Sequence, residues 1–248
     1  MKPVYEIPKT IIPEVKNSFC PGCHHSTITK IMAEVLDEMN LGGETIMVMP
    51  IGCGGMMGQY MNVDICASVH GRAPAIATGI KRIRPDKLVV SYQGDGDLAA
   101  IGMAEPIHAA NRGEKITVIF VNNAIFGMTG GQMAPTTLVG QKSTTTPGGR
   151  NPDLTGYPIK VCELIDSLKA PAFIARCAVD SPAHINAAKA AIRKAFEIQM
   201  AGKGYSFVEI LSACPTNWGM SPLKCLDYIR GPLMENYPLG VIRDVEEG

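Results

Sequence analysis

Two polar clusters with the composition of a cation site stand 25 residues apart in this chain. Gly94-Asp95-Gly96-Asp97 follows an apolar run over residues 87–92, and Asn122-Asn123 follows a second run over residues 116–121. If both runs are parallel strands, the clusters lie just past their carboxyl ends, where open α/β sheets bind ligands. A carboxylate, a side-chain amide and glycines that admit a phosphate suit Mg²⁺, which takes few protein oxygens and completes its shell with phosphates and water.

The alternative is that Gly-Asp-Gly and Asn-Asn mark ordinary turns, in which these residue types are common. The ligand site is favoured because a strand-like run precedes each cluster and the segment between them has helical spacing.

Four of the eight cysteines stand in loop contexts. Cys20-Pro21-Gly22-Cys23 precedes a predicted helix, Cys53 lies in a glycine-rich turn, and Cys214 precedes Pro215. Four thiolates are the usual ligands of a [4Fe–4S] cluster. A zinc site of four thiolates, or of Cys20 and Cys23 with a histidine from His24 or His25, and a redox dithiol stay open on spacing alone.

The composition limits the possible partners and compartments. The chain has 248 residues, a formal net charge of zero and few aromatic residues, so neither nucleic acid nor an anionic membrane surface is an expected partner. No apolar run approaches the roughly 20 residues that span a bilayer, and residues 1–6 show no signal-peptide core. We therefore expect a cytoplasmic protein, in which the cysteines are more often ligands, catalytic thiols or core residues than disulfides.

Strand-like and helix-like segments alternate along the chain, which predicts an α/β fold with a mostly parallel open sheet covered by helices on both faces. The predicted helices are residues 25–39, 73–83, 98–111 and 182–200, and the predicted strands are residues 45–50, 87–92, 116–121, 173–179 and 205–211. Residues 127–153 form a long loop rich in Gly, Thr and Pro, and such loops are more often functional than accidental. We expect one domain over residues 1–248, with an extended arm before residue 19 and another from residue 217.

Taken together, the motifs of this chain resemble those of one family, the β (thiamine diphosphate-binding) subunits of 2-oxoacid:ferredoxin oxidoreductases. The resemblance covers residues 19–218 and weakly favours the branched-chain and 2-oxoglutarate types over the pyruvate type. It rests on Cys20-Pro21-Gly22-Cys23, Ile51-Gly52-Cys53, His70-Gly71-Arg72-Ala73, Gly94-Asp95-Gly96-Asp97, Phe126-Gly127-Met128-Thr129-Gly130-Gly131-Gln132, Pro135-Thr136-Thr137 and Cys214-Pro215-Thr216.

The resemblance implies a set of ligands for each cofactor. Asp95, Asn123 and the backbone carbonyl of Ile125 would hold Mg²⁺, which bridges the two phosphates of thiamine diphosphate. The iron–sulfur interpretation becomes stronger than zinc, with Cys20, Cys23, Cys53 and Cys214 as ligands of a [4Fe–4S] cluster. The expected cofactor-binding residues are Gly94, Asp95, Gly96, Asp97, Asn123, Ile125, Gly127, Thr129 and Gln132.

His70 and Arg72 are the catalytic candidates. An arginine can bind a diphosphate or a carboxylate through two hydrogen bonds, and a histidine can move a proton. The alternative is that Arg72 starts a helix and that His70 is an ordinary loop residue.

The family's reaction is the coenzyme A-dependent oxidative decarboxylation of a 2-oxoacid to acyl-CoA and CO₂, with electrons passed through the cluster to ferredoxin. The resemblance also implies partner subunits: an α subunit that supplies the thiamine-activating Glu, which has no candidate in this chain, and γ and ferredoxin-like δ subunits.

Many relatives carry a basic residue where this chain has Met56, so we expect a more apolar pocket and a branched-chain substrate. Two other functions remain possible: a non-redox thiamine diphosphate-dependent decarboxylase or synthase subunit, and a metal-stabilised scaffold subunit without catalysis.

Overall fold

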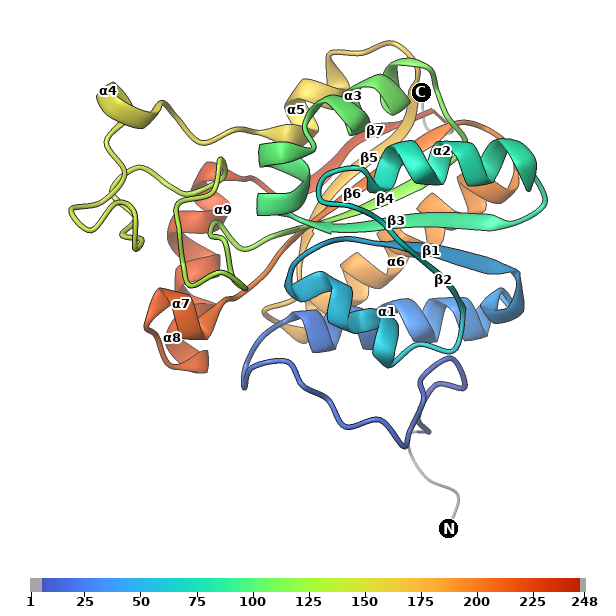
Figure 1. The fold of residues 1–248 in the computed structure, drawn as a ribbon, viewed down its shortest axis with the longest axis horizontal. Helices are drawn as coiled ribbons and strands as arrows, with labels where there is room; N and C mark the ends of the chain where they lie inside the picture. Colours follow the sequence, from blue (N-terminus) through green and yellow to red (C-terminus); the bar gives the residue numbers. More distant parts are fainter. Residues whose placement is uncertain (1–5, 246–248) are drawn as a thin grey trace.

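A computed structural model describes residues 6–245 of the chain. Within that range the strands form one seven-stranded sheet in the order β2-β1-β3-β4-β6-β5-β7 (Figure 1). All neighbouring pairs are parallel except β5 with β7, which is antiparallel, so the predicted mostly parallel open sheet is confirmed. The strands are β1 (Thr45–Met49), β2 (Asp64–Ala67), β3 (Leu88–Gly94), β4 (Thr117–Asn122), β5 (Pro171–Ala178), β6 (Tyr205–Leu211) and β7 (Gly240–Asp244).

Helices cover both faces of the sheet (Figure 1). One face packs against α1 (His25–Glu38) and α6 (Pro182–Met200), and the other against α2 (Ala73–Ile83), α3 (Ala104–Asn111) and α5 (Val161–Asp166). Successive side chains of a strand point to opposite faces, so Val90 joins the first core and Val89 the second. Because both faces are buried, the central strands are apolar runs rather than alternating ones.

Among the described residues, no helix has both the length and the hydropathy needed to cross a membrane.

The predicted helix over residues 98–111 is two elements. A π-helical turn over Gly96–Ile101 is followed by α3, and the break falls at Gly102. The backbone of Gly71 packs directly on this break, since a Cβ atom at Gly71 would lie only 2.7 Å from Cα of Gly102. Glycine at both positions therefore lets the loop before α2 approach the strand end that carries Asp95.

The C-terminal segment is not the extended arm that the sequence suggests. It folds into α7 (Pro215–Trp218), α8 (Pro222–Tyr228), α9 (Met234–Asn236) and β7, with a π-helical turn before α9. Four apolar side chains, each four residues from the next, bury a third core there against the long loop: Cys225, Ile229, Leu233 and Tyr237. The prolines in this segment conceal that helical period, because proline usually interrupts a helix.

The N-terminal segment does lack helices in its described part. Ile11 pairs with Met61 in an isolated bridge, and the N–H of Ile12 donates to the carbonyl of Tyr60 at 2.7 Å. Residues 6–18 thus lie along this chain's own surface, and residues 1–5 of the predicted arm fall outside the described range.

A buried ion network supports the strands under the polar clusters. Arg176 of β5, with 1% of its side chain exposed, donates from Nε to the Glu209 carboxylate at 2.7 Å. Glu209 of β6 in turn accepts a hydrogen bond from the Asn122 side chain at 2.7 Å. The network therefore links the middle of the sheet to the residue before Asn123.

Arg176→Met should lower the free energy of unfolding by about 3–5 kcal/mol, because it leaves the Glu209 carboxylate buried without its cation. Urea unfolding followed by circular dichroism measures this effect. Arg84→Met, which breaks the exposed pair with Asp86, is the control and should change the unfolding midpoint little. If the two substitutions lowered the free energy of unfolding equally, burial of the Arg176–Glu209 pair would not explain the effect.

Candidate active site

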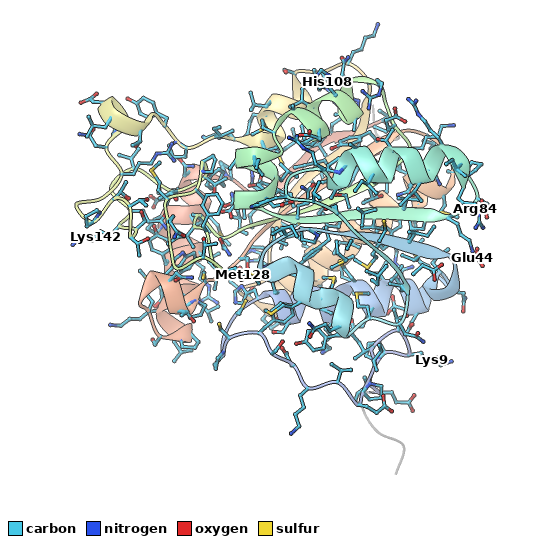
Figure 2. The ribbon with its side chains drawn as sticks, in the orientation of Figure 1. Lys9, Glu44, Arg84, His108, Met128 and Lys142 are labelled. Atoms are coloured by element: carbon cyan, nitrogen blue, oxygen red, sulfur yellow. The ribbon has the colours of Figure 1, made fainter. Side chains whose placement is uncertain are left out.

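A cavity of about 130 Å³ lies at the carboxyl ends of β1, β3 and β4. Met128 marks its rim, on the loop that follows β4, whereas the exposed His108 lies away from it on α3 (Figure 2). Most of the residues expected at the site line this cavity: His70, Gly94, Asp95, Gly96, Asp97, Asn123, Ile125, Gly127 and Thr129, with Cys53. The two polar clusters therefore meet as their spacing predicts.

Asp95 is a buried carboxylate without a cation beside it. Its side chain accepts hydrogen bonds from the N–H groups of Gly96 and Ile125 and from the Thr136 hydroxyl at 2.6 Å. Only 2% of the residue is exposed, and among residues 6–245 no salt bridge reaches it. Burial raises the pKa of this carboxyl to about 6, against the lowering effect of its hydrogen bonds. A divalent cation next to Asp95 would compensate the buried negative charge.

The turn after β4 has an unusual backbone conformation. Ala124 has a φ of 55°, the left-handed region that side chains other than glycine seldom adopt. The Asn122 side chain accepts from the N–H of Ala124 at 3.1 Å, and the Thr137 hydroxyl donates to its carbonyl at 2.7 Å. These bonds hold the turn in place, and backbone strain of this kind clusters at functional sites.

That turn brings two candidate ligand groups together, the side-chain oxygens of Asp95 and Asn123. The N–H of Ile125 lies between the Asp95 carboxylate at 3.2 Å and the Asn123 amide oxygen at 3.3 Å. The Trp218 indole donates to the backbone carbonyl of Asn123 at 3.0 Å and so fixes the turn from α7. The side-chain oxygens of Asp95 and Asn123 thus meet at the N–H of Ile125, and oxygens of these two types are ligands that a hard cation accepts.

His70 is oriented by Asp97, which is 3% exposed. Nδ1 of His70 pairs with the Asp97 carboxylate, which also accepts from the N–H of Gly71 at 2.9 Å and from the Gln93 amide at 2.6 Å. Asp97 lines the cavity, but its carboxylate oxygens are occupied by these hydrogen bonds, two of which come from the loop that carries His70. This arrangement fixes which ring nitrogen of His70 faces protein, as carboxylate partners of histidines commonly do.

Arg72 does not line the cavity. It occupies the position before the first residue of α2 and makes no side-chain cap there. Its guanidinium, 45% exposed, pairs with Glu105 of α3 instead. The structure therefore places Arg72 at a helix start, close to the alternative interpretation of this residue, and brings only His70 of the two catalytic candidates to the site.

Gln132 closes the base of the loop rather than facing the cavity. Phe126 and Gln132 form an isolated bridge, and the Gln132 amide donates to the carbonyl of Thr129 at 2.8 Å. The Thr129 hydroxyl donates to the Gln132 side-chain oxygen at 2.6 Å. The loop is held by its own bonds, and only Thr129 of this pair reaches the cavity lining.

Two of the four loop cysteines, Cys53 and Cys214, lie together beside the cavity. A Cβ atom at Gly127 would lie 3.3 Å from Sγ of Cys53, 3.7 Å from Sγ of Cys214 and 3.9 Å from the Asn123 amide nitrogen. Two cysteine sulfurs and Asn123, which belongs to the turn after β4 (the cation loop), therefore lie around the backbone of Gly127. Glycine at 127 leaves room for that approach.

The thiols also affect one another electrostatically. Burial raises the pKa of Cys23 to about 12, and the nearby Cys214, Cys53 and Cys20 add to that rise. Burial likewise raises the pKa of Cys53 to about 11, with contributions from Cys214 and Cys20. Each of these neighbours would disfavour a second thiolate unless positive charge lay among them. Across residues 6–245, no group of three or more His, Cys, Asp or Glu side chains is arranged to hold a metal ion.

Comparison with known proteins shows the family. The model of the thiamine pyrophosphate enzyme C-terminal TPP binding domain matches residues 50–210. The 2-oxoglutarate synthase subunit KorB of Methanocaldococcus jannaschii is 39% identical over 203 residues, covering 81% of this chain and 70% of that protein. The chain belongs to the thiamine diphosphate-binding subunits of the 2-oxoacid:ferredoxin oxidoreductases. Ketoisovalerate oxidoreductase subunit VorA of Methanothermobacter thermautotrophicus is 47% identical over 226 residues, or 91% of this oxidoreductase subunit.

The present oxidoreductase subunit spans about half of the VorA sequence, 47% of its length. A solved 2-oxoglutarate:ferredoxin oxidoreductase from Magnetococcus marinus, with 2-oxoglutarate, coenzyme A and succinyl-CoA bound, matches 98% of this subunit and 86% of its own chain, with a TM-score of 0.77 and 25% identity. A thiamine diphosphate-dependent 4-hydroxybenzoylformate decarboxylase from Rhodococcus jostii shares the fold alone, at a TM-score of 0.53 and 15% identity.

The cavity of this oxidoreductase subunit fits thiamine diphosphate in composition. Gly94 and Gly96 both line it: a Cβ atom at Gly94 would meet open space, whereas one at Gly96 would overlap the Phe126 ring, which packs there instead. The site thus offers bare backbone for phosphates and a buried carboxylate for their cation. The TPP-binding domain match supports the same cofactor.

One residue of the site, His25, was not predicted from the sequence as part of the cavity. It lines the cavity, forms a 2.6 Å hydrogen bond between Nδ1 and the Tyr92 hydroxyl, and stacks on Phe19 at 5.4 Å between ring centroids. Burial lowers the pKa of His25 to about 4, so the ring is neutral at physiological pH. Its place two residues after the Cys-Pro-Gly-Cys motif was the available signal.

Proposed function

We propose that this chain is the cofactor-binding subunit of an enzyme that oxidatively decarboxylates a branched-chain 2-oxoacid with coenzyme A. The products are acyl-CoA and CO₂, and the electrons leave through a [4Fe–4S] cluster to ferredoxin. The observation that carries the proposal is the environment of Gly127, where the sulfurs of Cys53 and Cys214 meet the cation loop of Asn123. Electrons released at the cofactor would have a short path to the cluster.

Asp95, Asn123 and the carbonyl of Ile125 would hold Mg²⁺, and the backbone at Gly94 and Gly96 would face the phosphates. Bound thiamine diphosphate supplies the electron sink that allows a 2-oxoacid to lose CO₂. The cation would also balance the negative charge of Asp95, which is buried and accepts hydrogen bonds from neutral donors.

The remaining cavity residues orient the reactants and exclude water. His70, with its Nδ1 bound to Asp97, can donate or accept a proton at its other ring nitrogen within the cavity. Ile51, Phe126 and Met128 give the cavity an apolar wall, which limits access of water to the reacting carbon. Thr129 offers a polar group on the loop above them.

Cys20, Cys23, Cys53 and Cys214 would hold the cluster, since four thiolates are its usual ligands. These cysteines come from three separate segments: the loop before α1, the turn after β1 and the start of α7. The iron of a bound cluster would supply the positive charge that offsets the effect of these thiolates on one another.

The proposed substrate rests on the relatives rather than on Met56. Met56 packs against the first core and accepts a hydrogen bond from the Ser18 hydroxyl at 3.8 Å, and it does not line the cavity. The higher identity to a ketoisovalerate oxidoreductase subunit, 47% against 39% for the 2-oxoglutarate synthase subunit, supports a branched-chain 2-oxoacid.

The assembled enzyme should therefore turn over 2-oxoisovalerate with a kcat/KM at least about tenfold above that for 2-oxoglutarate, since a pocket for an apolar chain leaves a second carboxylate without a partner. The measurement is coenzyme A-dependent reduction of methyl viologen by the anaerobic complex with each acid. A preference for 2-oxoglutarate would overturn the proposed substrate and leave the reaction class intact.

The relatives are named as subunits, and this chain spans about half of VorA, so we propose that it works in a larger assembly. An α subunit would supply the thiamine-activating Glu, γ and ferredoxin-like δ subunits would complete the complex, and the enzyme would act in the cytoplasm. The cofactor would then lie at a subunit interface.

A further inference from the structure

Asn217 of α7 joins the cysteine group to the loop over the cavity. Its side-chain Nδ2 donates to the backbone carbonyl of Gly127 at 2.7 Å and contacts Sγ of Cys214 at 3.4 Å. The side-chain amide of Asn217 therefore contacts both a proposed cluster ligand and the proposed cofactor loop.

The orientation of that amide follows from its partners. The carbonyl of Gly127 can only accept a hydrogen bond, so Nδ2 faces it and the side-chain oxygen points toward Gly131, 3.1 Å from where a Cβ atom would lie. The second proton of Nδ2 is then directed to the Cys214 sulfur. Burial raises the pKa of Cys214, and hydrogen bonds from the backbone and side chain of Asn217 oppose that rise.

The next residue along α7 makes a different contact. Trp218 donates from its indole nitrogen to the carbonyl of Asn123, in the cation loop, and not to a cysteine. Adjacent residues of one short helix therefore separate the two roles. The Asn217 amide contacts both the Cys214 sulfur and the carbonyl of Gly127, whereas the Trp218 indole donates its hydrogen bond to Asn123.

We propose that Asn217 is a positioning residue that sets the reduction potential of the cluster and ties it to the position of the Gly127 loop. The inference rests on the proposed function, because it needs a cluster on Cys214. Hydrogen bonds to ligand sulfurs stabilise the reduced, more negative cluster and so raise its potential. Since the same amide holds Gly127, a shift of the cofactor loop changes the bond to the sulfur.

The test uses the anaerobically purified complex carrying Asn217→Leu, which keeps the side-chain volume, or Asn217→Ala. A redox titration followed by electron paramagnetic resonance measures the potential of this chain's cluster, assigned as the signal lost in Cys53→Ser. We expect the equilibrium constant for reduction to fall about tenfold in both variants, equivalent to a potential about 59 mV lower for one electron. Trp218→Phe is the matched control: thiamine diphosphate should bind more weakly while the potential stays unchanged.

Three results would contradict the inference. Unchanged potentials in both Asn217 variants, with wild-type iron and sulfide content, would overturn it while the proposed function stands. An equal shift in Trp218→Phe would overturn it too, because a general effect of α7 would then explain the change. Absence of iron and sulfide from the wild-type complex would overturn the proposed function, and the role of Asn217 with it.

Discussion

Asp95→Asn should weaken binding of Mg²⁺ and thiamine diphosphate by more than about a hundredfold, and turnover should be lost at ordinary cofactor concentrations. Residues that hydrogen-bond the ligands of a metal commonly contribute 10- to 100-fold to metal affinity, and a charged residue that binds the metal directly contributes more. Gly96 donates to one carboxylate oxygen of Asp95 and Thr136 to the other, so the single asparagine oxygen can keep only one of these two hydrogen bonds. Circular dichroism of the variant separates the loss of charge from a change in folding. Calorimetric titration of the complex with thiamine diphosphate at fixed Mg²⁺ measures the weakened binding, with the exposed Asp86→Asn as control.

The same variant should be more stable than the wild type once the metal is removed with EDTA. The folded-state pKa of Asp95 is raised from 3.8 to about 6, so the fold disfavours its ionised form. The cost is absent below about pH 4 and complete above about pH 6, where it amounts to roughly 3 kcal/mol. Thermal unfolding at pH 7 and pH 4 should show the difference only at the higher pH. If Asp95→Asn and the wild type were equally stable at both pH values, Asp95 would have a partner that compensates its buried charge.

Cys53→Ser should remove the cluster and abolish electron transfer while thiamine diphosphate still binds. The expected loss is about four iron and four sulfide per chain, the content of one cubane. Cys53 is the informative position because it also lines the cavity, next to the cation loop. Iron and acid-labile sulfide analysis of the anaerobic complex measures the loss, and viologen reduction measures the activity.

The matched control is Cys66→Ser, on the edge strand β2, whose thiol contacts the carbonyl of Ala67 at 3.9 Å. It should keep both iron content and activity. Retention of full iron content in Cys53→Ser, or an equal loss in Cys66→Ser, would contradict the proposed ligand set.

The part of the cavity that is formed by residues at the ends of strands could be predicted from the sequence. Asp95 and Asn123 follow apolar runs, and parallel neighbours bring their carboxyl ends together, so their meeting is a consequence of the pattern. The residues of α6 and β6 also match the predicted ranges, because their periods are uninterrupted and Ser181 caps the helix.

Side-chain direction could not be predicted in the same way. Arg72 follows His70 by two residues, but Glu105, which is 33 positions away, draws its guanidinium out of the site. Asp97 looks like a cofactor ligand beside Asp95, yet its oxygens are bound by His70, Gly71 and Gln93. These contacts form where the loop at Gly71 packs on the break at Gly102, and local propensity indicates the break but not that long-range approach.

The gathering of the cysteines is likewise a product of the fold. Cys214 follows β6 and reaches Cys53, which follows β1, only because both strands point their carboxyl ends toward the same edge and α7 folds back over the loop at Gly127. The helical period that forms the C-terminal core is hidden by prolines, so the sequence suggested an arm where the chain packs.

The most direct test of the account is the stoichiometry of the reaction in the assembled, anaerobic complex supplied with thiamine diphosphate, Mg²⁺, 2-oxoisovalerate and coenzyme A. The account predicts one acyl-CoA, one CO₂ and two reduced one-electron acceptors for each 2-oxoacid consumed. Release of CO₂ with an aldehyde product and no reduction of the acceptor would contradict it, and would identify a non-redox thiamine diphosphate-dependent decarboxylase instead.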